Sequence, residues 1–162
     1  VEDILKTAEE RNEAPFIVIC DEIEDPHNLG AIIRTAECCG VHGIIIPKRR
    51  SASLNPTVAK TSAGALEYMK VARVTNIANT IDLLKSKGVW VFGADMDGED
   101  FKLTDYTVPC AIVIGNEGKG IGTLTAKKCD KIISLPMRGK INSLNASVAA
   151  GLLMYEVFRN RK

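Results

Sequence analysis

The chain has 162 residues, enough for one domain with a hydrophobic core, and its 46% hydrophobic and 25% charged residues are typical of a soluble globular protein. The formal net charge is only +1, with 21 Lys and Arg against 20 Asp and Glu, so the chain lacks the basic excess of many nucleic-acid-binding proteins. Any RNA binding must therefore depend on basic residues concentrated locally, as at 48–50 (Lys-Arg-Arg) or at Arg138 with Lys140.

Short apolar runs alternate with amphipathic stretches along the chain. The apolar runs predict buried strands at 16–20, 43–46, 71–74, 89–92, 111–114 and 132–135. The stretches between them predict helices at 26–39, 77–87, near 123–129 and at about 145–159, and a polar loop at 47–62 with a short helix from Pro56. This order predicts an α/β fold, a parallel sheet with helices on both faces. We expect a charged helical lead-in or linker at 1–14 and one catalytic domain at 15–162.

The five cysteines are expected to be small buried residues of a reducing cytoplasm. Their number is odd and no C-x-x-C pair occurs, which argues against a disulfide framework or a zinc site. No apolar run approaches the roughly 20 residues of a membrane span. The N-terminus also lacks the pattern of a signal peptide. The expectation is a cytoplasmic protein without a membrane segment or a bound metal.

The first candidate functional segment is 25–36, where a strand leads into a helix. Asp25 is placed to cap this helix and Pro26 to occupy its first turn. Asn28 lies in the first turn, and Arg34 lies off the apolar stripe that begins at Leu29, about 140° from it at 100° per residue. Taken alone, the two polar residues fit a cap and a solvated helix face better than they fit a site.

The second segment is the glycine-rich loop at 114–122, after the strand at 111–114. Four glycines in eight residues permit close approach of a ligand to the backbone and positive φ angles. The loop fits neither the G-x-x-x-x-G-K-[ST] nor the G-x-G-x-x-G pattern, so a nucleotide triphosphatase and a dinucleotide dehydrogenase are not supported. Glu117 inside the loop would repel phosphates and suits a ligand with hydroxyl or cationic groups.

The third segment, 135–147, runs from a strand through a Pro/Gly loop into the last helix. Ser143 and Asn145 precede that helix, where, taken alone, they fit capping residues better than functional ones. Within the helix one apolar face is expected, which fits core packing and a subunit interface equally well. That face consists of Leu144, Val148, Leu152, Tyr155 and Phe158.

Taken together, the three segments resemble the ordered motifs of the SpoU (TrmH/RlmB-like) family of SPOUT RNA 2′-O-ribose methyltransferases. The matching patterns are D-P-x-N-x-G-x-x-x-R-T-A at 25–36, G-x-E-G-x-G at 115–120 and S-L-N-x-S at 143–147. The resemblance covers 16–161, and the ordered set is far more specific than any one motif. It departs from the family at Ala146, where the family often has Val.

The resemblance implies a C-terminal part threaded into a deep trefoil knot, a homodimer, and S-adenosylmethionine as cofactor. By motif position, the residues expected at the cofactor are Gly115, Leu135, Leu144, Gly93 and Ala94. The residues expected to act on the substrate are Asn28, Arg34, Glu117, Ser143 and Asn145. Because an arginine side chain does not deprotonate in proteins, Arg34 is expected to grip a phosphate and to stabilise charge that develops on the 2′-oxygen.

The implied substrate is RNA, and a guanosine of 23S ribosomal RNA is the first choice. The lead-in and the segment at 135–140 look most like enzymes with that substrate, which carry an extra N-terminal RNA-binding domain. The alternatives are methylation of transfer RNA, a base-modifying SPOUT enzyme, and a SPOUT domain that binds RNA without catalysis. The complete set of five polar motif residues favours ribose chemistry over the last two.

Overall fold

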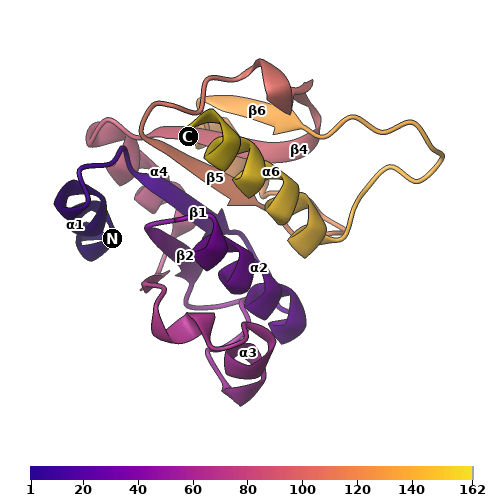
Figure 1. The fold of residues 1–162 in the computed structure, drawn as a ribbon. Helices are drawn as coiled ribbons and strands as arrows, with labels where there is room; N and C mark the ends of the chain where they lie inside the picture. Colours follow the sequence, from indigo (N-terminus) through magenta and orange to yellow (C-terminus); the bar gives the residue numbers. More distant parts are fainter. Residues whose placement is uncertain (162) are drawn as a thin grey trace.

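Six parallel strands form the sheet of the computed structural model, which describes residues 1–161 (Figure 1). The strands are β1 (Phe16–Cys20), β2 (Gly43–Pro47), β3 (Val71–Val74), β4 (Trp90–Asp100), β5 (Cys110–Ile114) and β6 (Lys131–Ser134). Their order in the sheet is β3-β2-β1-β5-β4-β6, and every neighbouring pair is parallel. Lys162, the last residue of the predicted catalytic domain, lies outside the described residues.

Helices cover both faces of the sheet, as predicted. They are α1 (Glu2–Glu10), α2 (Pro26–Cys38), α3 (Pro56–Thr61), α4 (Ile77–Ser86), α5 (Thr123–Lys128) and α6 (Ala146–Asn160). The core on one face includes residues of α2, α3 and α6, and the core on the other includes residues of α1, α4 and α5. The predicted lead-in is thus a helix that packs on the sheet, with Ile4 directly against Gly43. No helix within residues 1–161 is long and apolar enough to cross a bilayer.

The ends of α2 follow from local chemistry. The Asp25 carboxylate accepts a hydrogen bond from the backbone N of His27 at 2.9 Å, and Pro26 opens the first turn. Gly40, with φ of 75°, takes the left-handed conformation that ends the helix. The carboxyl end of β1 therefore leads within a few residues into a fixed helix that carries Asn28 and Arg34.

The predicted strand at 89–92 is too short, because β4 continues to Asp100. Beyond Phe92 every residue of the strand except Met96 is polar or small, so their hydrophobicity gives no strand signal. Backbone pairing with β6 holds them instead, with a register shift between Ala94 and Glu99. A Cβ at Gly98 would lie 2.6 Å from the backbone of Ile133, so this close approach requires glycine.

The apolar face predicted on the last helix is exposed rather than packed in the core. Val148, Leu152, Tyr155 and Phe158 retain 40–51% of their accessible surface. The buried side of α6 consists of Ala146, Ala150, Leu153, Met154 and Val157. The core-packing interpretation was wrong because α6 is apolar on two sides, and its smaller side chains face the sheet and α2.

The cysteines are all free, and most follow the expectation. Cys20, Cys39 and Cys110 are buried, and burial raises the pKa of the Cys20 thiol to about 12. Cys38 is exposed, contrary to the expectation of buried cysteines, because it lies at the end of α2 on the side away from the sheet. Its neighbour Cys39 is the buried member of the pair.

Candidate active site

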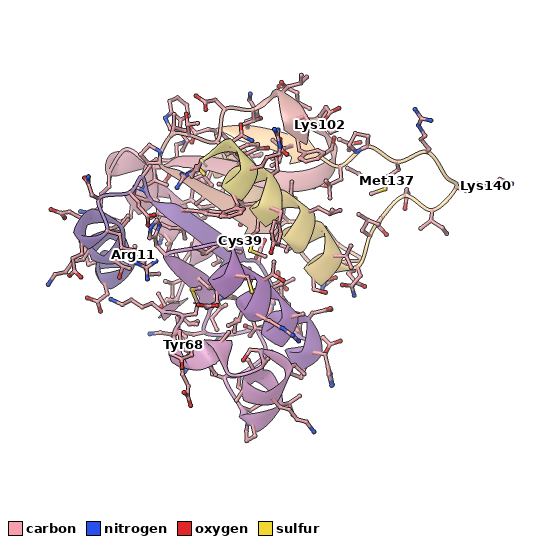
Figure 2. All side chains as sticks on the ribbon, in the orientation of Figure 1. Arg11, Cys39, Tyr68, Lys102, Met137 and Lys140 are labelled. Carbon is pink, nitrogen blue, oxygen red and sulfur yellow. The ribbon has the colours of Figure 1, made fainter. Side chains whose placement is uncertain are left out.

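A cavity of about 670 Å³ opens beside the middle of β4 and at the carboxyl ends of β5 and β6. Its walls come from the middle of β4, the glycine-rich loop after β5, the loop after β6 and the segment that enters α6. Ligands of open α/β sheets bind at this edge. Figure 1 shows the connection from β6 to α6 extending away from the sheet before it returns to the start of α6. Met137 and Lys140 lie on this connection (Figure 2).

The glycine-rich loop is a tight turn in which only glycine fits at two positions. A Cβ on Gly115 would lie 2.3 Å from the carbonyl carbon of Gly120, and Gly120 has φ of 68°. The backbones of Asn116 and Gly120 exchange two hydrogen bonds, of 3.2 and 2.7 Å. The loop therefore presents a fixed stretch of backbone to the cavity, as its glycine content predicted.

Two residues near the end of β1 anchor this loop, and the sequence analysis missed both. Asp21, buried, accepts a hydrogen bond from the backbone N of Gly122 at 2.9 Å. Burial raises the pKa of the Asp21 carboxyl. The backbone oxygen of Glu22 accepts from Nδ2 of Asn116 at 3.3 Å. The available signal was a pair of acidic residues directly after a buried strand.

Three of the predicted polar residues meet at the start of α6. Asn145 donates from Nδ2 to Oδ1 of Asn28 at 3.1 Å, and Oε1 of Glu117 accepts from the backbone N of Ala146 at 2.9 Å. A carboxylate in this position is favoured by the partial positive charge of a helix N-terminus. Ser143 and Glu117 line the cavity, and Asn145 lies between the lining residues Leu144 and Ala146.

The predicted cofactor-binding residues are only partly brought together. Gly115, Leu135, Leu144 and Ala94 line the cavity, whereas Gly93 does not. Gly93 is buried on the opposite face, where a Cβ would lie 2.8 Å from Cδ1 of Ile121. The residues of the wall that the sequence analysis did not single out include Asp95, Met96, Ile133, Pro136, Met137 and Leu153.

Arg34 does not line the cavity. It lies on the exposed side of α2, and within residues 1–161 its guanidinium takes part in no ion pair or side-chain hydrogen bond. Its neighbour Thr35 faces α6, since a Cβ on Gly151 would lie 3.8 Å from the Thr35 methyl group. Arg34 therefore lies near α6, outside the cluster that Asn28, Glu117 and Asn145 form.

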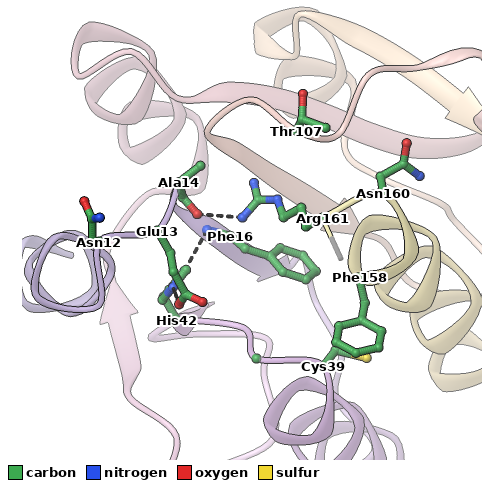
Figure 3. Close-up of a pocket in the computed structure, with 11 residues that line it drawn as sticks. Asn12, Glu13, Ala14, Phe16, Cys39, His42, Thr107, Phe158, Asn160 and Arg161 are labelled. Carbon is green, nitrogen blue, oxygen red and sulfur yellow. Dashed lines mark hydrogen bonds and ion pairs between the residues drawn. The ribbon is translucent and has the colours of Figure 1, made fainter.

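A second cavity, of about 500 Å³, lies at the amino ends of β1 and β5 and contains no predicted site residue (Figure 3). The Arg161 guanidinium there donates to four backbone carbonyl oxygens, those of Ala14, Pro15, Tyr106 and Val108, at 2.6–3.0 Å. His42 accepts from the backbone N of Phe16 at 2.9 Å. These groups are engaged in holding the chain together, so we take this cavity as structural.

The main cavity has the size and chemistry of a site for a small nucleoside-like ligand. Its volume lies within the usual range for small-molecule sites. Leu135, Leu144 and Leu153 supply apolar wall, and the glycine loop supplies backbone donors and acceptors. Asp95 and Glu117 suit hydroxyl or cationic groups better than phosphates. Within residues 1–161 no group of three or more His, Cys, Asp or Glu side chains is placed to hold a metal ion.

Comparisons with known proteins agree with this geometry. Residues 15–155 match the SpoU rRNA Methylase family. The chain is 59% identical over 162 residues to YacO of Bacillus subtilis, named as a TrmH family tRNA/rRNA methyltransferase, and the match covers 99% of the chain and 65% of YacO. The chain thus spans about 65% of the length of this relative.

Solved structures share the fold, among them the following two. The SpoU methyltransferase AviRb of Streptomyces viridochromogenes, in complex with the cofactor AdoMet (S-adenosylmethionine), superposes with a TM-score of 0.86 at 32% identity, over 92% of this chain and 61% of AviRb. The TrmH/SpoU tRNA modifying enzyme of A. aeolicus gives a TM-score of 0.84 at 30% identity, over 99% of this chain and 83% of that enzyme.

Proposed function

Because the chain belongs to the SpoU rRNA methylase family, whose cofactor is S-adenosylmethionine, we propose that it methylates a ribose 2′-hydroxyl of RNA. The observation that carries this proposal is the cluster of Asn28, Glu117 and Asn145 beside a cavity of cofactor size. The cluster offers amide and carboxylate groups that can form hydrogen bonds with the hydroxyl groups of a sugar. This favours a ribose over a base as the methyl acceptor.

Four of the predicted residues would hold the cofactor, namely Ala94, Gly115, Leu135 and Leu144. Leu135 and Leu144 offer apolar surface to an adenine, and the backbone at Gly115 can bond to polar groups of the ligand. When bound, S-adenosylmethionine supplies a methyl group on a positively charged sulfur. The carboxylates of Asp95 and Glu117 make this cavity favourable for a cationic ligand.

The substrate ribose would be held by Asn28, Ser143 and Asn145. The amides of Asn28 and Asn145 are fixed by their mutual hydrogen bond, which reduces the entropy lost when a sugar binds between them and Ser143. Glu117 would be a positioning residue, because its carboxylate accepts from the backbone N of Ala146 and so fixes the first turn of α6. An in-line approach of the 2′-oxygen depends on such fixed groups.

Arg34 would bind the phosphate next to the modified nucleotide and stabilise negative charge on the 2′-oxygen. Its exposure, and the absence of a side-chain partner among residues 1–161, leave its guanidinium free to bind an anion. We propose that the active unit is a homodimer formed through the exposed apolar face of α6. Arg34 lies near that helix, so dimer formation would place it close to the subunit interface.

We further propose a guanosine of 23S ribosomal RNA as the target, a cytoplasmic location, and a trefoil knot formed by the chain around the cavity. The lead-in and the segment at 135–140 support the ribosomal target. The name of the B. subtilis relative includes both transfer and ribosomal RNA. Transfer RNA is therefore the alternative substrate that the experiment must compare with ribosomal RNA. The proposed domain limits remain 1–14 for the lead-in and 15–162 for the catalytic domain.

The test is isothermal titration with S-adenosylmethionine, followed by methyl-transfer assays on ribosomal and transfer RNA transcripts. Nucleoside analysis of the digested product should show a 2′-O-methylated nucleoside, and a substrate with deoxyribose at the target should accept no methyl group. Cofactor binding with methylation of a base would overturn the ribose assignment. Failure of the folded chain to bind the cofactor would overturn the enzyme assignment.

A further inference from the structure

The basic loop, residues 48–50 (Lys-Arg-Arg), lies at the same edge of the sheet as the candidate active site. It follows β2 directly, and β2 is parallel to β1, which is parallel to β5. The backbone N of Lys48 donates to the oxygen of Val74 at 2.8 Å, and that of Ala52 donates to the oxygen of Ile23 at 2.9 Å. The loop is therefore held at both ends, with its three side chains exposed.

The connection formed by residues 21–25 lies between the basic loop and the cavity. Nη1 of Arg50 is 3.9 Å from Oε1 of Glu22 on that connection. The backbone oxygen of Glu22 accepts from Asn116, which lines the cavity. The same connection leads into α2 and Asn28. An RNA strand that places a ribose beside Asn28 therefore passes close to the basic loop.

Two charged residues on this path have a backbone conformation that favours glycine. Arg50 has φ of 58° and Glu22 has φ of 60°. Side chains with a Cβ are disfavoured in this left-handed region. Their presence at two facing positions indicates that the side chains themselves are used, since glycine would form the same turns at lower energetic cost.

The charge of the basic loop is largely uncommitted. Within residues 1–161, Lys48 and Arg49 form no ion pair, and Arg50 has only the 3.9 Å contact with its side chain 75% exposed. Some lysines elsewhere are closely paired, as for the half-buried Lys128 with Asp82 at 3.0 Å. A protein of net charge +1 thus concentrates free positive charge beside its candidate active site.

We propose that Lys48, Arg49 and Arg50 bind the phosphates that flank the modified nucleotide. The inference rests on the proposed function and adds the surface across which the RNA strand lies. Arginine binds a phosphate through two parallel hydrogen bonds, and lysine binds it as a point charge. Such contacts position the strand without reading its sequence. The loose 3.9 Å contact of Arg50 with Glu22 would give way when a phosphate binds the guanidinium.

The experiment compares two triple variants that each remove three positive charges. One is Lys48→Gln with Arg49→Gln and Arg50→Gln. The matched control is Lys6→Gln with Arg11→Gln and Lys127→Gln, exposed cations on α1, after α1 and on α5, away from the active-site edge. Affinity for a labelled single-stranded oligouridylate and for a 23S ribosomal RNA transcript is measured at several salt concentrations. Titration with S-adenosylmethionine reports whether each variant keeps an intact cavity.

We expect the basic-loop variant to bind RNA about tenfold more weakly or worse. The slope of log K against log salt should become shallower by about 2, because each of the three lost phosphate contacts contributes roughly 0.7. The control should keep the wild-type slope, and both variants should keep wild-type affinity for the cofactor. An equal loss in both variants, or an unchanged slope in the basic-loop variant, overturns the proposal. So does a wild-type chain that binds the cofactor but no RNA, whereas a chain that binds neither overturns the proposed function instead.

Discussion

Asn145 joins two parts of the candidate active site that are 117 positions apart in sequence. Its Nδ2 donates to Oδ1 of Asn28 at 3.1 Å, while its Oδ1 accepts from the backbone N of Ser147 and of Val148 at 2.9 and 3.2 Å. One side chain therefore caps α6 and also fixes the position of Asn28. The two alternatives that the sequence left open for Asn145, a cap and a functional residue, are compatible in one geometry.

Two substitutions separate these roles of Asn145. Asn145→Ala removes the cap and should lower the free energy of unfolding by about 1 kcal/mol as well as reducing methyl transfer. Asn145→Ser keeps a capping oxygen but is too short to reach Asn28. We expect its free energy of unfolding in urea to lie within about 0.5 kcal/mol of the wild-type value. The variant should nevertheless lose most of its methyl-transfer activity. Full activity in the serine variant would show that the contact with Asn28 is dispensable.

Arg34→Ala should reduce methyl transfer by about a hundredfold or more and leave cofactor affinity nearly unchanged. The reason is that Arg34 lies outside the cavity and has no partner to lose among residues 1–161. Turnover is measured on RNA and cofactor affinity by calorimetry. Arg34→Lys keeps the charge but not the paired donors, so it should restore only part of the rate. Equal loss of both quantities in the alanine variant would exclude a role confined to the substrate.

Leu152→Glu should convert a dimer into a monomer. Leu152 lies in the middle of the exposed apolar face of α6 and keeps 49% of its surface in the single chain. A carboxylate there would be buried without a partner in an interface, which is costly. Sedimentation equilibrium measures the mass of each variant, and Lys127→Glu, on the exposed side of α5, serves as a matched surface control. A wild-type chain that is monomeric at all concentrations contradicts the proposed interface.

The sequence predicted the sheet well because each inner strand is a continuous apolar run, as in β1 and β5. It failed where apolar patterns carry no information. The far part of β4 is held by backbone pairing with β6, and hydrophobicity does not report such pairing. On α6 both sides are apolar, so periodicity did not decide which side faces the core.

The candidate site was predictable only in part for a similar reason. Spacing placed Glu117 after a strand and Asn145 before the last helix, but it gave no reason for Asn28 to contact Asn145. Only the family resemblance implied that the three residues belong to one site. Asp21 was missed because an acidic residue after a strand is common and usually solvated. Its role depends on the backbone of Gly122, 101 positions away, and no local pattern reports that contact.

Arg161→Ala should destabilise the fold without affecting cofactor affinity. The Arg161 guanidinium satisfies four backbone oxygens from the segments that lead into β1 and β5, and it lies 5.4 Å from the centre of the Phe16 ring. Removal leaves these part-buried oxygens without a charged donor, and we expect a loss of about 3 kcal/mol in urea denaturation. Arg159→Ala is the neighbouring control, because the Arg159 side chain is exposed and, within residues 1–161, donates to the single half-buried carboxylate of Glu156, so its loss should be smaller, about 1 kcal/mol.

His42 should make the stability of the fold fall as the pH is lowered. Nδ1 of His42 accepts from the backbone N of Phe16, and Nε2 lies 2.9 Å from Oε1 of Glu13, so the neutral ring donates from Nε2 (Figure 3). Burial lowers the pKa of His42, although the hydrogen bond and charge of Glu13 oppose this and the charges of Arg11 and Arg161 add to it. The stabilisation from the neutral ring is therefore complete above the unfolded-state pKa of about 6.5 and is lost as the pH falls through the lower folded-state value.

The measurement for His42 is the free energy of unfolding in urea between about pH 7.5 and pH 5, where few carboxyl groups titrate. Wild type should lose stability across this range, because the unfolded chain binds a proton that the folded chain resists. His42→Gln has no imidazole to titrate, so its curve should be flatter even if its stability at pH 7.5 is lower. Parallel curves for the two proteins would show that His42 titrates alike in the folded and unfolded states. A protonated Nδ1 cannot accept a hydrogen bond from the backbone N of Phe16. Parallel curves would therefore contradict the acceptor role of Nδ1 in the folded protein.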